Sequence, residues 1–589
     1  MTDGGDRRRF LLASLGLAGV GAAGPATSSQ TAGGSTEVPQ WTRRQGAPVL
    51  AEAYGVPSPF EAGVVRHRRS RSALPGAGSS TTPLQDLHGI VTPNGLHFER
   101  HHAGVPAIDP ARHRLLVHGL VERPLVFRME DLLRLPSVSR MHFIECSGNS
   151  SWAEPAPGST AGDIHGLISC CEWTGPLLST VLAETGVGEQ ACWVLAEGAD
   201  AAALTRSIPI GKAMDDAILA YAQNGERLRP EQGYPLRLVL PGFEGNMSVK
   251  WLRRLKLGDQ PFQTREETSK YTDLMPDGTA RQFTFVMEAK SVITFPSGGQ
   301  RLGDRGFYEI SGLAWSGRGK IVRVEVSTDG GASWSDAVLQ APVLSKCLTR
   351  FRAPWRWDAQ RPNWPAAPPM RPATSSRSAK PWSRRAASTP AITTTASSPG
   401  AWAWTGRSVM RREAAIMVIA ALAAWPADAQ RVGIGRPAAA DEIAAWDIDV
   451  RADGRGLPAG RGEARQGREV FSRKCAACHG AEGQGGLADA LVGGQGTLAS
   501  AHPRRTVGSY WPYATTLFDY IRRAMPFDAP QSLRADEVYG LCAYILALNR
   551  IVAPNAVMDA QSLPKVRMPN RSGFTGPDPR PDVGPRARR

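Results

Sequence analysis

Cysteine is scarce in this chain, with eight residues among 589, and their positions are irregular. That number and spacing exclude a disulfide scaffold. The sequence also lacks an apolar run of ordinary transmembrane length, and it lacks a recognition module in which basic and aromatic residues are interleaved. The formal net charge is +15, but the excess arginine is concentrated near the N-terminus, in the middle and at the C-terminal end. This distribution is typical of tails and linkers, so we predict no nucleic-acid partner.

Apolar residues make up 42% of the chain, which is enough for several hydrophobic cores, and the length predicts about three or four domains. An α+β domain is predicted over 96–265, because strand-like runs at 114–121, 192–196 and 236–240 alternate with helical patterns at 129–135 and 175–184. Short alternating runs at 292–295, 308–315 and 321–326, with glycine-rich turns between them, predict a β-sandwich over 275–360. A third domain is predicted over 430–570, where the apolar spacing of 535–548 indicates a helix.

Two segments have the form of export signals. Three arginines at 7–9 precede a short apolar stretch, which is typical of a twin-arginine signal over 1–30 and predicts a periplasmic protein. Residues 410–429 repeat the pattern of a basic start, a short apolar run and an Ala-x-Ala site. Because 361–409 shows no periodicity, we hypothesise that two exported proteins are joined through a disordered or frame-shifted linker. Residues 31–95 and 571–589 are predicted to be an extended arm and a basic tail without chemistry.

The strongest local motif is Cys475-Ala-Ala-Cys478-His479. Two thiols three residues apart can bond both vinyl groups of haem, and the adjacent histidine then faces the iron as an axial ligand. A zinc or redox CxxC site is the alternative, which the following histidine and the export signals disfavour. One such motif predicts one covalently bound haem c.

Met525, between Ala524 and Pro526, is the candidate for the second axial ligand of the haem iron. A thioether ligand raises the haem potential, which suits an electron acceptor. Met558 and Met568 are alternative ligands, and an ordinary core position is the other interpretation of Met525.

A single cysteine, Cys146, follows an apolar strand-like run and precedes a Ser-Gly-Asn turn. This context predicts a thiolate on a loop at a strand end, and a thiolate is a soft ligand that suits a redox metal. A lone cysteine beside a glycine is otherwise an ordinary small buried residue. The distinction depends on the residues that accompany Cys146.

Several motifs, in their order along the chain, resemble two known families. Over 432–570, the segments 471–480, 507–513 and 523–526 resemble a class I c-type cytochrome, and more closely the cytochrome subunit of the Sox sulfane dehydrogenases. Over 96–358, Cys146 and the segments 98–106, 232–242 and 246–251 resemble the sulfite oxidase family, in particular the molybdenum subunit of the same Sox enzymes. The resemblance implies a multidomain chain: an α+β sulfite-oxidase-type molybdopterin domain, an Ig-like β-sandwich dimerisation domain and an all-α class I cytochrome c domain.

Position by position, the resemblance implies a molybdenum–molybdopterin cofactor. Cys146 would be the protein thiolate on molybdenum, Tyr271 would lie near the oxo ligand, and Arg100 would face the substrate anion. A third substrate arginine would be Arg350 or Arg352. The positions implied to hold the pterin and its phosphate, for which cations and N–H donors are suited, are Arg100, His101, His102, Asp200, Gln232, Arg237, Ser248, Val249 and Lys250.

Two positions depart from the family pattern. Sulfite oxidases have an arginine five residues after the cysteine, where this chain has Ser151, and a pterin-binding histidine where it has Gln232. The loss of one cation should weaken the capture of a small dianion by about 1.5–3 kcal/mol. This difference favours a substrate other than free sulfite.

The resemblance therefore implies a sulfane dehydrogenase of the Sox sulfur-oxidation system. Sulfane sulfur on a cysteine of a sulfur-carrier protein would be oxidised with oxygen from water, and the electrons would leave through haem to a soluble cytochrome c. A homodimer through the Ig-like domain is also implied. The alternatives are a sulfite dehydrogenase that acts on free sulfite, a molybdopterin reductase of protein methionine sulfoxide, and an electron-carrier cytochrome with an inactive molybdenum domain. The cytochrome and the β-sandwich argue against the reductase.

Overall fold

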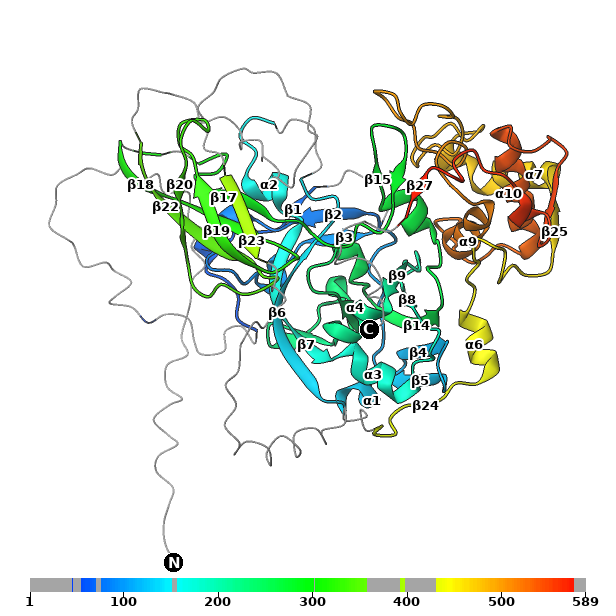
Figure 1. Cartoon of the computed structure of the whole chain (residues 1–589), viewed down its shortest axis with the longest axis horizontal. Helices are drawn as coiled ribbons and strands as arrows, with labels where there is room; N and C mark the ends of the chain where they lie inside the picture. The colour runs from blue at the N-terminus through cyan, green and yellow to red at the C-terminus, as the bar shows by residue number, and fades with distance from the viewer. Residues whose placement is uncertain are drawn as a thin grey trace, which may run out of the picture. The chain divides into compact units, whose positions relative to one another are not determined.

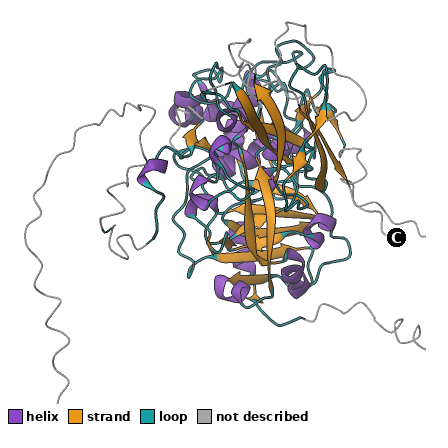
Figure 2. Cartoon of the chain, turned by 90° about the vertical axis from the view of Figure 1, so that its left-hand side faces the viewer, coloured by secondary structure: helices purple, strands orange, loops and turns teal. Residues whose placement is uncertain are grey.

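The computed structural model describes residues 45, 54–69, 76–150, 156–300, 302–303, 305–357 and 431–576, and the backbone of 392–397. The predicted signal over 1–30, the segment 410–429, most of the predicted linker, Ser151 and the residues after 576 lie outside these ranges. The chain divides into two units, 1–62 and 63–589, and the second contains every strand and α-helix described below. Strands, in orange in Figure 2, are its main elements, and the helices are short.

A mixed six-stranded sheet is the centre of the first domain (Figure 1). Its strand order is β24-β5-β4-β14-β8-β9, and β14 runs parallel to β4 but antiparallel to β8. The strands and covering helices are β4 Arg114–Gly119, β5 Leu125–Arg128, β8 Trp193–Gly198, β9 Thr205–Pro209, β14 Leu252–Gly258, β24 Arg436–Pro437, α1 Met129–Leu133, α3 Leu178–Thr185 and α4 Ile210–Asp215. Val117, Val194 and Leu255 of the sheet pack with Leu182 of α3 in one buried core, because alternate residues of these strands face the helices.

A second sheet, in the order β12-β11-β7-β6, positions Cys146. The long strands β6 Ser137–Glu145 and β7 Ile168–Pro176 pair antiparallel over their full lengths, with Glu145 opposite Ile168. Cys146 follows β6 directly and begins a turn, as the sequence predicts. The remaining elements here are β10 Ile218–Ala220, β11 Ala222–Gln223, β12 Glu226–Arg227, β13 Arg237–Val239 and the helix α2 Ala161–His165.

The N-terminal arm is partly folded, which corrects the prediction of an extended segment over 31–95. Strands β1 His67–Arg68 and β2 Gly78–Thr81 form a three-stranded sheet with β3 Glu99–His101. Leu84, a few residues on, is fully buried among residues of the first and second domains. Strands of two to four residues are too short to give a periodic signal, so the sequence did not reveal them.

Two packed sheets form the second domain, which confirms the predicted β-sandwich (Figure 1). One has the order β17-β18-β22-β21 and the other β20-β19-β23. The strands are β17 Lys290–Phe295, β18 Gly306–Trp315, β19 Lys320–Val326, β20 Ser335–Asp336, β21 Val338–Leu339, β22 Thr349–Trp357 and β23 Ile392–Ser397. Ile310, Val324 and Phe351 fill the space between the sheets. Strand β23 lies within the linker predicted to be disordered, and it pairs with β19 through backbone hydrogen bonds, which need no periodic side-chain pattern.

The third domain has a helical core of α7, α9 and α10, with Phe471, Phe518 and Leu541 buried between them. Its elements are α6 Ala440–Trp446, β25 Arg461–Glu463, α7 Ala464–Lys474, α8 Ala476–His479, α9 Ala514–Ala524, α10 Ala535–Leu548, β26 Val557–Asp559 and β27 Phe574–Thr575. Strand β27 joins β15 Asp273–Leu274 and β16 Ala280–Arg281 in a small sheet. None of the helices in the described ranges is long and apolar enough to cross a bilayer.

A buried set of charges joins the first and third domains, and we call it the Arg254 network. Its fully or almost fully buried members are Glu197, Arg254, Asp449, Asp519 and Arg523. Arg254 contacts Glu197 at 2.5 Å and Asp449 at 2.6 Å, and Arg523 contacts Glu197 at 2.5 Å and Asp449 at 2.8 Å. Because each buried charge faces a charge of opposite sign, the network is electrostatically satisfied only when the two domains are in contact.

The segment that leads into the third domain also packs on the first. The Glu184 carboxylate accepts hydrogen bonds from the N–H groups of Val432, Gly433 and Ile434 at 2.6, 3.0 and 3.3 Å. Ile434 is part of the hydrophobic core of the first domain. Strand β24 then pairs with β5 at the edge of the six-stranded sheet.

Candidate active site

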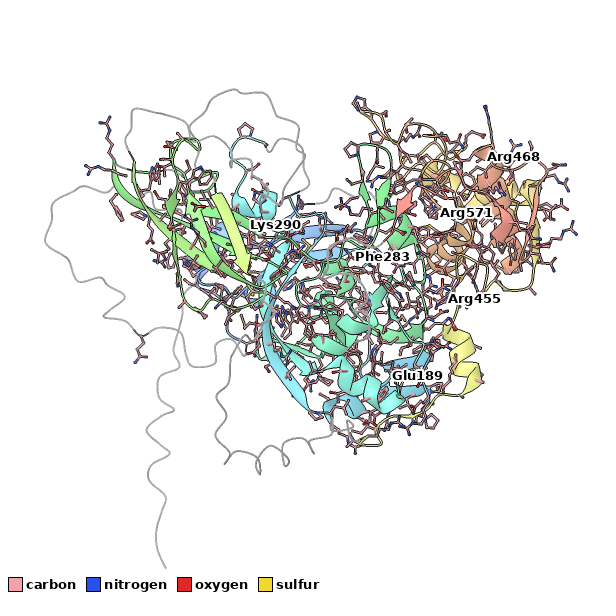
Figure 3. The ribbon with its side chains drawn as sticks, viewed as in Figure 1. Glu189, Phe283, Lys290, Arg455, Arg468 and Arg571 are labelled. Atoms are coloured by element: carbon pink, nitrogen blue, oxygen red, sulfur yellow. The ribbon has the colours of Figure 1, made fainter. Side chains whose placement is uncertain are left out.

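Cys146 is held at the end of β6 by hydrogen bonds from both sides. Its N–H donates to the Leu167 carbonyl at 2.9 Å, and its own carbonyl accepts from the N–H of Asn149 at 2.9 Å. The preceding residue, Glu145, is fully buried and accepts from Lys290 (labelled in Figure 3) at 2.9 Å and from Trp315 at 2.8 Å. The position of the thiol is therefore fixed by the β-sandwich as well as by its own domain.

A cavity of about 700 Å³, including its solvent-filled opening, lies against this thiol, and we call it the Cys146 cavity. Ten of the positions predicted from sequence line it: Arg100, His101, His102, Cys146, Asp200, Gln232, Arg237, Ser248, Lys250 and Tyr271. They come from β3, the end of β6, the loop after β8, the segment around β13 and the segment that ends in Tyr271. Residues that span some 170 positions of sequence thus converge on one site.

Three basic side chains line the cavity: Arg237 is buried, and Arg100 and Lys250 are half-buried. Burial lowers the pKa of Arg237 to about 9 and that of Lys250 to about 7, and the charge of Arg237 lowers the latter further. The Lys250 ammonium donates to the carbonyls of Arg100 and Glu231 at 3.2 and 3.1 Å. Asp200 is the only carboxylate among the described residues of the lining, and burial raises its pKa. The cavity therefore favours an anionic ligand.

Several buried polar atoms of the lining have no hydrogen-bond partner within the described protein. They are Arg237 Nε, Asp200 Oδ1, His97 Nε2 and Asn246 Oδ1. Buried polar atoms are normally satisfied, so a ligand with both donors and acceptors is expected here. A pterin ring with a phosphate has this mixture, and the neighbouring thiol adds a metal ligand. The residues present therefore fit a molybdopterin cofactor.

Tyr271 and His102 face each other in the cavity. The Tyr271 hydroxyl lies 3.3 Å from His102 Nε2, and the Arg206 guanidinium lies over the Tyr271 ring, 5.1 Å from its centroid. Burial raises the pKa of Tyr271 and lowers that of His102, so both are neutral near pH 7. A neutral hydroxyl is suited to donate a hydrogen bond to an oxygen in the cavity.

Three positions that the sequence suggested for the site, Val249, Arg350 and Arg352, do not line the Cys146 cavity. The side chain of Val249 is buried in the core of the first domain and does not line the cavity. Arg350 donates to the carbonyls of Leu87 and Gly89, and Arg352 pairs with Glu309 on the sandwich surface. Neither arginine is among the described residues that line the Cys146 cavity.

Sequence reasoning missed His97, Asn246 and Trp251 as lining residues. Burial is the first cause that lowers the pKa of His97, to about 3, so this histidine is neutral. Asn246 and Trp251 lie in the segment 246–251, which resembles the sulfite oxidase family, so this resemblance could have predicted them as lining residues. His97 lies next to the motif 98–106, and no residue pattern distinguished it.

The CxxCH motif forms a second site. Cys475 and Cys478 are free, half-buried thiols at the end of α7 and in α8, and burial raises the pKa of Cys475 to about 11. Nδ1 of His479 lies 2.7 Å from the Asp489 carbonyl, to which it can only donate. The other ring nitrogen, Nε2, is then a free acceptor, as a metal-binding histidine requires. These residues fit a haem attached through two thioethers.

The three candidate methionine ligands differ in burial. Met558 and Met568 are almost fully buried in the core of the third domain. Met525 is half-buried, immediately after α9, and its N–H donates to the Ile521 carbonyl at 3.1 Å. Met525 therefore has a side chain that can reach a ligand outside the core.

A short stretch, 270–272, connects the two sites. Tyr271 lines the Cys146 cavity, whereas Thr272 Oγ1 lies 2.7 Å from the Tyr510 hydroxyl in the third domain. Lys270 forms an ion pair with Asp489, whose carbonyl accepts from His479. The two sites are thus connected by three consecutive residues, one ion pair and two hydrogen bonds.

Three family models match this chain, each over one domain. They are the oxidoreductase molybdopterin binding domain over 102–266, the Mo-co oxidoreductase dimerisation domain over 281–359, and cytochrome C oxidase, cbb3-type, subunit III over 462–545. These matches confirm the predicted fold class and both predicted cofactors, molybdopterin and haem.

Among characterised relatives, mitochondrial sulfite oxidase of Mus musculus is 31% identical over 324 residues, which are 51% of this chain and 58% of the relative. The NADH nitrate reductase of Ulva prolifera is 34% identical over 314 residues, 47% of this chain and 36% of the relative. The chain thus spans about a third to three fifths of these two relatives.

Among solved structures, the sulfane dehydrogenase SoxCD from Paracoccus pantotrophus is similar, with a TM-score of 0.53 and 47% identity. The match covers 55% of this chain and 84% of that one. Together with the three domain models and the arrangement of the Cys146 cavity, this likeness shows that the chain belongs to the sulfite oxidase family of molybdopterin oxidoreductases, here followed by a c-type cytochrome domain.

Proposed function

We propose that this chain is a periplasmic sulfane dehydrogenase, which oxidises sulfane sulfur on a cysteine of a carrier protein and passes the electrons through its own haem to a soluble cytochrome c. The observation that carries the redox part is the contact of 270–272 with both the Cys146 cavity and the third domain. The substrate is proposed from the likeness to the Paracoccus enzyme, at 47% identity. A homodimer is proposed from the match to the dimerisation domain.

The reaction balances with water as the oxygen source. Each oxygen added to sulfur comes from one water molecule, which releases two protons and two electrons. When bound, the molybdenum cofactor would supply oxygen-atom transfer to a soft sulfur nucleophile, and haem would accept the electrons one at a time.

Different residues of the cavity would bind the metal, the cofactor phosphate and the substrate. Cys146 would provide the protein ligand to the metal, and its fixed backbone would hold that ligand in place. Arg237, which is buried, and Lys250, which is half-buried, would hold the phosphate of the cofactor. Arg100 would bind the anionic end of the substrate, and the Tyr271 hydroxyl would donate a hydrogen bond to an oxygen near the reacting sulfur.

The third domain would take up the electrons. Cys475 and Cys478 would attach the haem, and His479 and Met525 would be the axial ligands. The bonded route from Tyr271 through Lys270 and Asp489 to His479 is short and lies within one chain. Intramolecular transfer would therefore not depend on protein concentration.

Cys146→Ser tests the proposal in the full-length chain carrying both cofactors. The variant should lose turnover with a persulfidated carrier protein and keep the haem absorption spectrum of the parent. Cys192→Ser, which alters an exposed free cysteine, is the matched control and should keep full activity. Retained activity in Cys146→Ser would overturn the assignment.

Sulfite dehydrogenation is the second candidate, favoured by the basic side chains that line the cavity and by the sulfite oxidases among the relatives. Comparison of kcat/KM for sulfite and for persulfidated carrier decides between the two. A purified chain that contains haem but no molybdenum would instead support an electron-carrier cytochrome.

A further inference from the structure

Glu145, the residue before Cys146, carries a buried carboxylate that the proposed reaction does not use. Its side chain is fully buried, and Glu145 is not among the described residues that line the Cys146 cavity. A buried carboxylate is costly unless cations or hydrogen-bond donors satisfy it. The partners of this carboxylate therefore show which parts of the chain depend on it.

Two of these partners belong to the β-sandwich. Lys290 Nζ donates to Glu145 Oε1 at 2.9 Å, and Trp315 Nε1 donates to Oε2 at 2.8 Å. Lys290 begins β17, Trp315 ends β18, and the two are directly opposite each other in the antiparallel pair. Since opposite residues of neighbouring strands share a face of the sheet, one cross-strand pair contacts both carboxylate oxygens.

The third partner lies in the turn that carries Cys146. Asn149 Nδ2 donates to Glu145 Oε1 at 3.0 Å, and Asn149 Oδ1 accepts from the N–H of Leu167 at 3.1 Å. The N–H of Asn149 donates to the Cys146 carbonyl. Glu145 and Asn149 thus close a ring of hydrogen bonds around Cys146, and the carboxylate attaches the β-sandwich to this ring.

The backbone of Glu145 is packed as closely as its side chain. A Cβ atom on Gly245, which lines the Cys146 cavity, would lie 2.7 Å from the Glu145 carbonyl oxygen and 3.1 Å from the Ile144 side chain. Only glycine leaves room for this approach. Because closely packed groups transmit displacements, a change at the Glu145 carboxylate should reach Cys146.

We propose that Glu145 is a positioning residue for the metal-binding thiol, and that the β-sandwich sets the redox potential of the metal through Lys290 and Trp315. The negative charge of Glu145 would make the metal harder to reduce, and the charge of Lys290 would offset part of this effect. The sandwich would then serve the reaction as well as dimerisation. The inference rests on the proposed function, because it assumes that Cys146 binds molybdenum.

The test measures the midpoint potential of the bound molybdenum in the full-length chain carrying both cofactors. A redox titration followed by electron paramagnetic resonance gives this potential. Glu145→Gln keeps the shape of the side chain and removes its charge, so the metal should become easier to reduce. At a fixed potential, the ratio of reduced to oxidised metal should rise roughly 10- to 100-fold, as expected for one charge at an effective dielectric constant of about 20. Each tenfold change corresponds to about 59 mV for a one-electron couple.

Lys290→Met should shift the potential in the opposite direction, because Glu145 then lacks its charged partner. The double variant, Glu145→Gln with Lys290→Met, removes both charges and should have a potential between those of the two single variants. Lys320→Met is the matched control, since Lys320 is an exposed lysine of the same domain at the start of β19. Its potential should equal that of the parent.

Trp315→Phe adds a test that does not depend on a change of charge. It keeps a buried aromatic ring and removes one hydrogen bond to Glu145, so kcat should fall several-fold while KM and the haem spectrum stay those of the parent. An unchanged potential in Glu145→Gln, a shift of the same sign in Lys290→Met, or an equal shift in Lys320→Met would overturn the inference and leave the proposed function standing. A Cys146→Ser chain with the turnover of the parent would overturn the proposed function instead.

Discussion

Arg254→Met should separate the molybdopterin domain from the cytochrome domain without unfolding either. Arg254 is fully buried in β14 and contacts Asp449, which leads into the cytochrome domain, at 2.6 and 2.8 Å. Methionine has a similar length but no charge, so Asp449 would keep only Arg523 and Lys256 as cationic partners. Each domain has a hydrophobic core of its own, and the substitution touches neither.

The size of the effect follows from burial. Removing one partner of a buried ion pair costs about 3–5 kcal/mol, because the remaining charge is left partly uncompensated away from water. Arg254 also pairs with Glu197 of its own domain at 2.5 Å, so part of this cost falls within the molybdopterin domain. The ratio of docked to undocked domains therefore falls by at most roughly 100- to 5000-fold. Asp449→Asn should have an effect of the same direction, and the double variant should lose less than the sum of the two, because the two residues share one interaction.

The assay is the rate of haem reduction after mixing with substrate, followed by stopped-flow absorbance. Arg254→Met should slow this rate while the haem spectrum stays that of the parent. Arg318→Met is the control, since Arg318 pairs with Glu288 on the surface at 3.0 Å and such pairs contribute at most about 1 kcal/mol. If Arg254→Met reduced haem as fast as the parent, or if the double-variant coupling were below about 0.5 kcal/mol, the Arg254 network would not be what holds the domains together.

Acid should also separate the two domains. Burial raises the pKa of Glu197 and of Asp449, but the charges of Arg254 and Arg523 outweigh it, so both pKa values are lower than usual. Their stabilising contribution is then complete above the unfolded values near pH 4 and is lost as the pH falls further, which a pH series of haem-reduction rates would show. Met525→Ala should lower the haem potential and change the ligand spectrum, whereas Met558→Ala should lower only the thermal stability; redox titration distinguishes them. Residues 1–409 and 430–589, co-produced as two chains, should co-purify with haem bound, and their separation at moderate salt would contradict a docking role for the buried charges.

Elements with a clear period were predictable. The helix expected over 535–548 coincides with α10 Ala535–Leu548, and the runs expected for the β-sandwich correspond to β17, β18 and β19. The arm strands β1 and β2 and the strand β23 were not predicted, because two to six residues of mixed composition give no hydrophobic repeat. These segments form strands because they pair with strands elsewhere in the sequence, as β23 does with β19.

The Cys146 cavity was predictable only through resemblance. No spacing rule joins Arg100, Cys146 and Tyr271, and the family pattern alone brought them together.

The covalent joint is not what places the cytochrome domain. If 410–429 is a cleaved signal, the chain becomes two pieces, and the second then begins beside Val432, where Glu184 accepts three backbone N–H groups. Strand β24, the Arg254 network and the Thr272–Tyr510 hydrogen bond all lie beyond that point. Since each of these contacts needs both pieces but none needs the linker, a cut chain and an intact chain would reach the same docked arrangement. The fused form would gain only a higher effective concentration of one domain for the other. A frame error in 361–409 would therefore change how readily the two domains associate, and it would leave the path from Tyr271 to His479 intact.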